Sequence, residues 1–293
     1  MATITKQDAF NNAIMAYMSE LKGGALKKFC DVRTQEGGEN IVFNRVKPSL
    51  TGNGRIESMY GQGQNPNDGG DMVEIKVPIS YVGEQQKIKD EDMKKTTIDV
   101  KNVYVKSLGN AVMRREDMAI VDAIVGATPT AGGTEYSAPN KVQITTDFTK
   151  EASVKMVIKE IRRAQALASN TPDNHRGVAL VMSPKDWADL STSEYVLNQD
   201  YAVQYGGGAD GTPDRFYGAE VVILPETASK VGHTNHLAYV IPSNTVCFGE
   251  WEGSVRGDAV FVPTDGMTWH LQAVKSIGVK LAEAHCITQF ANA

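Results

Sequence analysis

The chain has 293 residues, of which 41% are hydrophobic and 22% charged, and its formal net charge is −5 at neutral pH. This length predicts one large domain or two, and the composition is ordinary for a globular protein, without an apolar run long enough for a membrane helix. The acidic balance argues against tight binding to the phosphate backbone of nucleic acids.

The N-terminus and the cysteines indicate an intracellular protein. Residues 1–21 do not show a basic region followed by an apolar core, so we expect no secretory signal peptide. The three cysteines, Cys30, Cys247 and Cys286, are far apart and odd in number. This pattern is typical of reduced thiols in a cytoplasm and does not favour a disulfide framework or a zinc site.

Residues 5–24 have the pattern of a short amphipathic helix. Thr5 can cap its start, and the glycine pair at 23–24 ends it. Apolar residues recur on one face at Phe10, Ile14, Tyr17, Met18 and Leu21. The helix either packs on its own core or forms an arm that reaches a neighbouring molecule, and terminal helices more often pack at home.

Two strand-like segments, 39–47 and 72–81, flank a long stretch rich in glycine. In the second segment apolar and polar residues alternate from Val73 onward, which predicts a strand with one wet face. Pro78 cannot donate a backbone hydrogen bond, so we place it at an edge or a non-bonding position. The stretch between them, 49–70, has six glycines and few bulky apolar residues. The sequence therefore predicts a long β-arm with a glycine-rich tip.

Two helices are predicted next. The first spans 97–125, ends at Gly126 and carries an apolar stripe made of Val100, Val103, Tyr104, Leu108, Ala111 and Val112. The charge run at 114–117 interrupts this stripe, and we interpret it as a solvated face. The turn-rich residues 127–140 predict a surface loop. The second helix follows Thr149, and its apolar face comprises Val154, Val157, Ile158, Ile161, Ala164 and Ala168.

Short strands alternate with turns in the second half of the chain. Residues 178–182 predict a buried strand, and Ser183 with Pro184 predicts the cap and first position of a helix. Residues 205–214 predict a second glycine-rich loop. Further strand-like runs are found at 219–225, 237–242, 245–251, 259–263, 269–281 and 284–290. Helices early and strands late give an α+β fold class with a projecting β-arm.

No stretch of the sequence carries a motif for catalysis, a metal or a cofactor. Phosphate-binding loops, paired-histidine zinc motifs, paired cysteines and nucleophile elbows are all missing. We interpret the glycine-rich 206–211 and the acidic 65–71 as plain turns. In a strand, the side chains of His285 and Cys286 would point to opposite faces, which excludes a nucleophile–base pair. We therefore predict no enzymatic activity, no metal and no cofactor.

Four stretches, in this order along the chain, point to a family. They are VALVMSPKDWADL (178–190), RFYGAEVVILPETA (215–228), LAYVIPSNTVCFGEWEG (237–253) and VKSIGVKLAEAHCITQF (274–290). With the arm, the long helix and the returning strands, this order resembles the major capsid (coat) proteins of tailed double-stranded DNA bacteriophages. Those proteins share the Hong Kong 97-type shell fold, and the resemblance covers the chain from about residue 40.

The resemblance implies a division of the chain into the parts of that fold. The implied parts are the N-arm (1–40), the extended loop (41–95), the peripheral domain with its spine helix (96–150 and 263–293) and the axial domain (151–262). The segment 203–214 would then lie near the axis of a hexamer or pentamer.

The function that the resemblance implies is structural. The chain would assemble with itself, through hexamers and pentamers, into the icosahedral head shell of a virion around the phage genome. The shell would form in the bacterial host cytoplasm, with a portal, decoration proteins and non-specifically contacted double-stranded DNA, and without a membrane. Because the helix at 5–22 begins almost at once, a separate scaffolding protein is expected. The tip contains no lysine, so we expect no lysine-derived crosslink from it.

The resemblance also gives the glycine-rich tip a role. A segment with little core of its own can lie across a neighbouring subunit and become ordered there. The expected inter-subunit contacts in the tip are Arg55, Glu57, Met59 and Tyr60, because arginine and tyrosine often carry interface energy. Further contacts are expected around the axis at Tyr205 and Asp210.

Two other functions stay open from the sequence. The same fold could form an encapsulin-like nanocompartment that holds an enzyme, which would differ from a phage head in particle size, portal and DNA. A soluble α+β enzyme with an unrecognised site is the second alternative, because sites assembled in space can be hidden in a sequence. Such an enzyme would be a small oligomer, whereas a shell protein would form capsomers or megadalton particles.

Overall fold

The computed structural model describes residues 24–46, 72–91, 100–126, 139–144, 148–169, 177–197, 215–225, 231, 238–253 and 255–292. The predicted helix N-terminal to Gly24, the arm tip at 49–70 and the loop at 205–214 lie outside these residues.

Helices and strands are mixed along the described chain, as the α+β prediction requires. The helices are α3 (Val100–Gly126), α4 (Glu151–Ser169), α5 (Pro184–Ser191) and α6 (Glu194–Leu197), with 3-10 turns η1 (Lys27–Phe29) and η3 (Ala284–Cys286). The first strands are β1 (Asp31–Gln35), β2 (Asn40–Val46), β3 (Met72–Pro78), β4 (Ser80–Lys89) and β5 (Asn140–Ile144). The later strands are β6 (Val178–Met182), β7 (Arg215–Phe216), β8 (Ala219–Ile223), β9 (Ala238–Pro242), β10 (Val246–Trp251), β11 (Arg256–Val262), β12 (Thr268–Leu281) and β13 (Thr288–Asn292).

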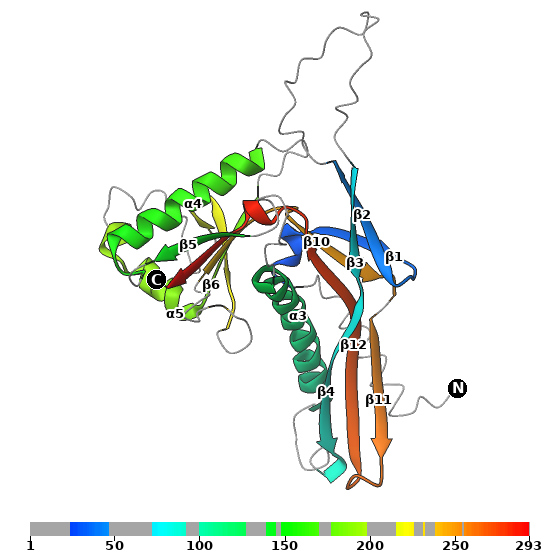
Figure 1. Ribbon diagram of the computed structural model, residues 1–293. Helices are drawn as coiled ribbons and strands as arrows, with labels where there is room; N and C mark the ends of the chain where they lie inside the picture. The colour runs from blue at the N-terminus through cyan, green and yellow to red at the C-terminus, as the bar shows by residue number, and fades with distance from the viewer. Residues whose placement is uncertain are drawn as a thin grey trace, which may run out of the picture.

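A six-stranded sheet with the order β5-β13-β9-β6-β8-β7 forms one half of the described fold (Figure 1). Every residue of β6 and of β9 is buried, because both faces of this sheet are covered. Alternate residues of β6 face opposite cores: Leu180 packs with α4 and α5, whereas Val181 packs with η1 and the C-terminal half of α3. The predicted buried strand at 178–182 is confirmed.

The second large sheet is long and covered by α3 on one side (Figure 1). Its order is β1-β10-β12-β11, and β4 also pairs with β12. The long strand β12 joins these parts, because its first ten residues pair with β4 and its last four with β10. Trp269 and Leu271 of β12 pack under the N-terminal half of α3, next to Ile88 of β4.

The predicted strand at 72–81 is interrupted. Strand β3 ends at Pro78, and β4 begins at Ser80 and moves to the other sheet. The physical reason is that Pro78 has no N–H to continue a ladder, so the chain changes partner there. The pairing of β2 with β3 confirms the predicted base of the β-arm, with Val46 opposite Met72 at its outer end.

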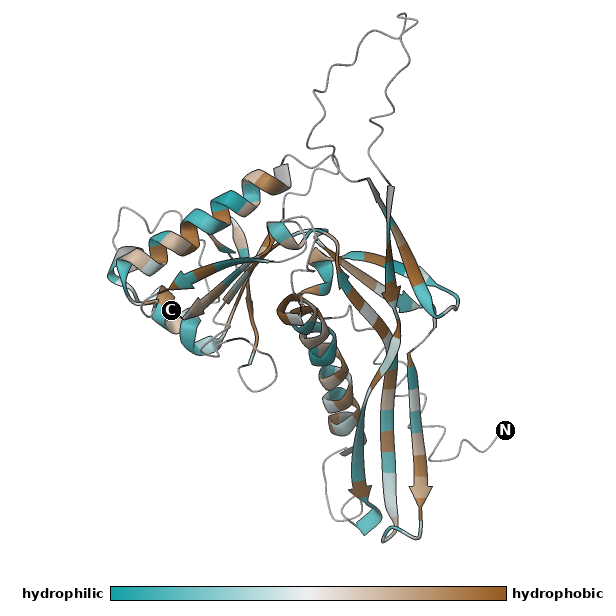
Figure 2. Cartoon of the chain, in the orientation of Figure 1, coloured by the Kyte–Doolittle hydropathy of each residue, from teal (hydrophilic) through white to brown (hydrophobic). Residues whose placement is uncertain are grey.

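The two predicted helices are confirmed as α3 and α4, and one residue of the stripe predicted for α3 is exposed. Helix α4 buries Val154, Val157 and Ile161 and exposes polar residues between them, and Figure 2 shows its ribbon in alternating brown and teal segments. In α3 the side chain of Val103, which was predicted to belong to the apolar stripe, is 55% exposed. Val105, which was not part of the predicted stripe, is buried. In α4 the carboxylate of Glu160 is also buried, although it is charged.

Glu160 is buried because it joins three elements. It accepts hydrogen bonds from Asn140 Nδ2 at the start of β5 and from Thr288 Oγ1 at the start of β13, and it pairs with Arg163 on its own helix. The cap predicted at Ser183 is also confirmed, since its Oγ accepts from the backbone N–H of Asp186 at 3.1 Å.

Candidate functional site

The residues predicted to touch neighbouring subunits cannot be placed. Arg55, Glu57, Met59, Tyr60, Tyr205 and Asp210 all lie outside the described residues. Their contacts therefore stay predictions, as does the division of the chain into four parts. The structure does describe the root of the arm, the exposed edge of the long sheet and a buried ionic joint between them.

The root of the arm is a closed hairpin base. Strands β2 and β3 pair along their whole length, so the segment 47–71 begins and ends at the adjacent residues Val46 and Met72. One face of the hairpin is apolar: Ile41, Phe43, Ile75 and Val77 are buried together with Cys247 of β10. The described part of the root is consequently packed against its own subunit.

Two glycines allow the root to lie close to the long sheet. A Cβ on Gly278 of β12 would lie 2.9 Å from Val77 Cγ1 and 3.1 Å from the carbonyl carbon of Pro78. A Cβ on Gly249 of β10 would lie 3.1 Å from Ile41 Cδ1. A side chain at 278 would collide with the backbone of the hairpin, whereas one at 249 would require only a small shift of Ile41.

Strand β11 is an edge of the long sheet and exposes apolar side chains. Val260 is 44% exposed and Phe261 is 37% exposed, and Met267 in the turn that follows is 60% exposed. Near this turn, Asp265 Oδ2 contacts Lys87 Nζ at 2.8 Å and His270 Nε2 at 2.9 Å. The hydrogen bonds from Lys87 and His270 hold the pKa of Asp265 below its usual range. This edge offers a neighbouring molecule both strand backbone and apolar side chains.

A buried ionic joint connects α3, β10, β12 and η1. Lys275 of β12 contacts Glu116 of α3 at 2.5 Å and Glu250 of β10 at 3.0 Å. Lys27 of η1 contacts the same oxygen of Glu250 at 2.8 Å. Glu116 is 1% exposed and its neighbour Asp117 is 6% exposed. We call Lys27, Glu116, Asp117, Glu250 and Lys275 the ionic joint. Two of them, Glu116 and Asp117, belong to the charge run that we predicted to be a solvated face.

That interpretation was wrong for the acidic half of the run and holds for the basic half. Arg114 and Arg115 are exposed, whereas Glu116 and Asp117 are buried. The signal was in the spacing: Leu108, Val112 and Ile120 form the buried stripe at intervals of four, and Glu116 occupies the missing position. The charge of the side chain hid a position that the helical period assigns to the interior.

Three groups of the joint have shifted pKa values: those of Asp117 and Lys275 are raised, and that of Glu250 is lowered. Burial raises the pKa of Asp117 to about 6, although the N–H groups of Leu26 and Ala25 oppose the shift. Burial also disfavours the charged form of Glu250, but Lys27 and Lys275 outweigh it and lower its pKa. For Lys275 the attraction of Glu116 and Glu250 outweighs burial and raises its pKa. The two lysines thus favour the charged form of Glu250 inside the protein.

The prediction for His285 and Cys286 was wrong in its geometry. The two residues lie in the 3-10 turn η3 and not in a strand, and Cys286 Sγ lies 3.3 Å from His285 Nε2. Burial, with the nearby Glu283, raises the pKa of Cys286 to about 12, and burial lowers the pKa of His285. At neutral pH the pair is a buried thiol beside a neutral imidazole, which is the opposite of an activated thiolate.

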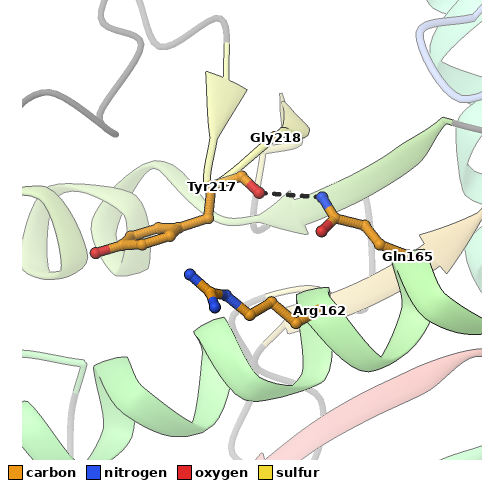
Figure 3. A pocket seen from close by; sticks show the side chains of 4 residues that line it. All are labelled: Arg162, Gln165, Tyr217 and Gly218. Carbon is orange, nitrogen blue, oxygen red and sulfur yellow. Dashed lines mark hydrogen bonds between the residues drawn. The ribbon is translucent and has the colours of Figure 1, made fainter.

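A shallow hollow of about 480 Å³ lies between α4 and the turn that joins β7 to β8. Figure 3 shows Arg162 and Gln165 of α4 facing this turn, with Gln165 Nε2 donating to the carbonyl oxygen of Tyr217 at 3.0 Å. Tyr217 and Gly218 both have positive φ, and a Cβ on Gly218 would lie 2.8 Å from Gln165 Nε2. The hollow is lined by Arg162, Gln165, Tyr217 and Gly218, which offer no acid–base pair.

Other kinds of site are missing from the described ranges. No cluster of three His, Cys, Asp or Glu residues there has the geometry of a metal site. The helices of the same ranges are too short or too polar to span a membrane. The cysteines at 30, 247 and 286 are all buried thiols, and burial, with Asp117 nearby, raises the pKa of Cys30.

Comparison with solved structures places the whole fold among viral and virus-like shells. The capsid of the cyanophage P-SCSP1u is 17% identical over 93% of this chain and 89% of its own, with a TM-score of 0.63. The capsid of Ralstonia phage GP4 is 12% identical over 92% and 91%, with a TM-score of 0.58. A virus-like particle from Pyrococcus furiosus is 14% identical over 97% and 98%, with a TM-score of 0.60. At these identities the likeness concerns the fold alone.

The family follows from the sequence itself. No curated protein matches the chain. The family described as phage capsid protein matches residues 2–284, which is nearly the whole chain. Its members are structural proteins of the particle shell, and the mixed α+β fold agrees with the capsids above. The chain therefore belongs to the phage capsid protein family.

Proposed function

We propose that the chain is the major capsid protein of a tailed phage and assembles through hexamers and pentamers into an icosahedral head around double-stranded DNA. The family supports a shell-forming role, and the observation that carries the finer statement is the arm root. A closed hairpin base packed on its own subunit fixes the two points between which the segment 47–71 runs. Ring-closing contacts between identical subunits need such an element at the same place on every copy.

The four parts expected from the sequence are retained in this proposal. Residues 1–40 act as the N-arm, 41–95 as the extended loop, 96–150 with 263–293 as the peripheral domain, and 151–262 as the axial domain. The exposed edge strand β11 with Phe261 and Met267 supports a further contact surface at the far end of the long sheet.

The contact residues proposed in the tip are Arg55, Glu57, Met59 and Tyr60, and those proposed near the axis are Tyr205 and Asp210. The test replaces residues 52–69 by a short Gly/Ser link. Because Val46 and Met72 are adjacent partners in the hairpin, a short link closes it without strain. The variant should keep the melting temperature of the wild type and fail to form stable shells, since removal of an anchoring side chain costs a few kcal/mol at every subunit.

The control for this deletion is the single substitution Gly37→Ala, in the bend between β1 and β2, where a Cβ meets no atom within 4 Å. It should fold and assemble like the wild type. Normal heat-stable shells from the deletion variant would show that the tip is a plain surface loop. A deletion variant that does not fold would show that the tip is part of the core.

Partners and place of assembly complete the proposal. Assembly in the host cytoplasm would involve a separate scaffolding protein, a portal and decoration proteins, and the net charge of −5 supports weak, non-specific contact with the packaged DNA. Submicromolar binding of the isolated protomer to duplex DNA at physiological salt would contradict that last point.

The alternative is an enzyme-filled nanocompartment, which the likeness to a virus-like particle from Pyrococcus furiosus keeps open. Electron microscopy of particles purified from the natural source decides between the two. A phage head should show one portal vertex and packed DNA, and the ratio of absorbance at 260 and 280 nm should indicate nucleic acid. Particles without portal or DNA that hold a second protein would contradict the phage-head proposal.

A further inference from the structure

The first described residues of the chain lie between the two halves of the fold. Leu26 is 1% exposed and Phe29 is 5% exposed. Both belong to an apolar cluster that includes Ile120 of α3, Val181 of the six-stranded sheet and Phe248 of the long sheet. Leu26 and Phe29 therefore share one apolar cluster with α3, the long sheet and the six-stranded sheet.

The backbone of this segment is held by two buried carboxylates. The N–H of Gly24 donates to Glu116 Oε2 at 2.8 Å. The N–H of Ala25 donates to Asp117 Oδ2 at 3.1 Å, and the N–H of Leu26 donates to Asp117 Oδ1 at 2.9 Å. Three successive N–H groups thus bond to two successive side chains of α3, which fixes the position and the direction of the chain.

Gly24 is required for this approach. A Cβ at residue 24 would lie 2.7 Å from Asp117 Cγ, which is closer than real Cβ contacts allow. The other oxygen of Glu116 contacts Lys275, which also contacts Glu250. Any side chain at 24 must displace the Asp117 carboxylate and disturb the three N–H bonds together.

From this geometry we propose that Glu116 and Asp117 are positioning residues for assembly: they form a latch that fixes where residues 1–23 leave the subunit. The proposal rests on the shell-forming function given above. Identical subunits can exchange identical contacts only when every copy sends its N-terminal segment out from the same point and in the same direction. The latch supplies that point with charge-assisted hydrogen bonds. Lys275 of β12 contacts both Glu116 of the latch and Glu250 of β10, and so connects the latch to the long sheet.

The latch differs from an ordinary packing contact in a way that an experiment can resolve. Leu26 and Phe29 hold the segment to the apolar core and contribute to the stability of the fold, whereas the carboxylates hold the backbone just before them. Loss of the latch should therefore free residues 24–26 without melting the sheets.

The experiment is a double-mutant cycle of Gly24→Ala and Asp117→Ala in the full-length chain. Gly37→Ala is the control for adding a methyl group to a glycine, because a Cβ there meets open space. Three measurements are made on each variant. They are hydrogen exchange of peptides that cover 24–30 and of peptides that cover β6 and β9, the melting temperature, and electron microscopy of the assembly products.

We expect Gly24→Ala to increase exchange in 24–30 by about tenfold or more while exchange in β6 and β9 stays unchanged. Shells should then be fewer and irregular, and the control should behave as wild type. The Asp117→Ala background has already lost two of the three N–H bonds of the latch and the carboxylate that a Cβ at residue 24 would clash with. Adding Gly24→Ala there should change neither exchange nor assembly further.

Two results would overturn the latch. One is regular shells in wild-type yield from Gly24→Ala despite faster exchange, which would limit the carboxylates to a local structural role. The other is an equal effect of Gly24→Ala in both backgrounds, which would place the clash elsewhere. If Gly24→Ala does not fold, Asp117→Asn, which keeps the volume, is measured in the same way with the same expectation. A wild-type chain that forms no shells contradicts the proposed function itself, which separates that failure from failure of the latch.

Discussion

The centre of the six-stranded sheet is buried and the ionic joint is largely buried, but they are built from opposite kinds of side chain. In the sheet, every residue of β6 and β9 is buried, and the cluster between sheet, α4 and α5 is apolar. In the joint, two lysines and three carboxylates lie between apolar clusters at the two ends of α3. Apolar packing is non-directional and stabilises, whereas charge pairs have one good geometry and fix position.

The two regions differ because only one of them has to fix the angles between the elements that meet there. The six-stranded sheet must hold together, and volume and pattern are sufficient for that. The joint is where η1, α3, β10 and β12 meet, so an error of angle there is carried along the whole long sheet (Figure 1). We expect substitutions in the joint to lower the free energy of unfolding by several kcal/mol and substitutions at the surface to leave it unchanged.

The largest effect is expected for Lys275→Ala. The change leaves Glu116 and Glu250 without the lysine between them, and breaking a buried pair from one side costs about 3–5 kcal/mol. Urea denaturation followed by circular dichroism measures it. The control is Lys280→Ala on the same strand, which is exposed and should change the free energy of unfolding by less than about 0.5 kcal/mol. Equal effects of the two changes would show that the joint contributes no more than a surface charge.

A slightly smaller effect is expected for Leu180→Ala in the apolar region. Its side chain is fully buried, and truncation leaves a cavity that costs about 3 kcal/mol. Leu180→Met keeps the volume and should cost less than about 1.5 kcal/mol. Both values should be independent of salt, which distinguishes this region from the joint. A strong salt dependence of the Leu180→Ala effect would contradict the comparison.

The next effect concerns pH. The pKa of Asp117 is raised to about 6, so the folded state holds its proton more tightly than the unfolded state. The contribution of this group to stability is therefore present at low pH and is lost as pH rises toward and through 6. Between pH 5 and pH 7 it should fall by about 1 kcal/mol. The difference in unfolding free energy between wild type and Asp117→Asn, measured across this range, should show that slope; a difference that does not change with pH would refute it.

The smallest effect is expected at the exposed end of the long sheet. Asp265→Asn removes the partner of Lys87 and His270, but these contacts are in solvent and are screened. The melting temperature of the monomeric subunit should not change. A clear decrease would mean that surface charge pairs stabilise this fold as much as the buried joint does.

The sequence predicted the elements that obey a simple period. The buried strand at 178–182, the helix after Thr149 and the cap at Ser183 follow from alternation, helical spacing and capping chemistry. Strands β1, β4 and β5 were missed, because each has polar residues on an exposed side and gains its strand form from a partner distant in sequence. Pairing, and not propensity, decides such segments.

The site was harder to predict than the fold, for a physical reason. Glu116 and Asp117 were predicted to be solvated because their partners, Lys275 and the N–H groups of Gly24 to Leu26, are far away in the sequence. His285 and Cys286 were separated by an assumed strand, whereas the chain turns there. The first error came from letting charge outweigh the helical period, because the partners that stabilise the buried carboxylates are distant in the sequence. The second came from a local turn inside a segment with strand-like residues. Arg55 to Tyr60 could be proposed from residue type alone, and they remain a prediction.

The central claim is that this chain forms the shell of a phage particle, and sedimentation velocity of the purified full-length protein tests it most directly. We expect species the size of pentamers and hexamers, or particles in the megadalton range, with the wild-type sequence. Exclusively monomers or dimers, at every concentration and salt condition in which the protein stays folded, would contradict it.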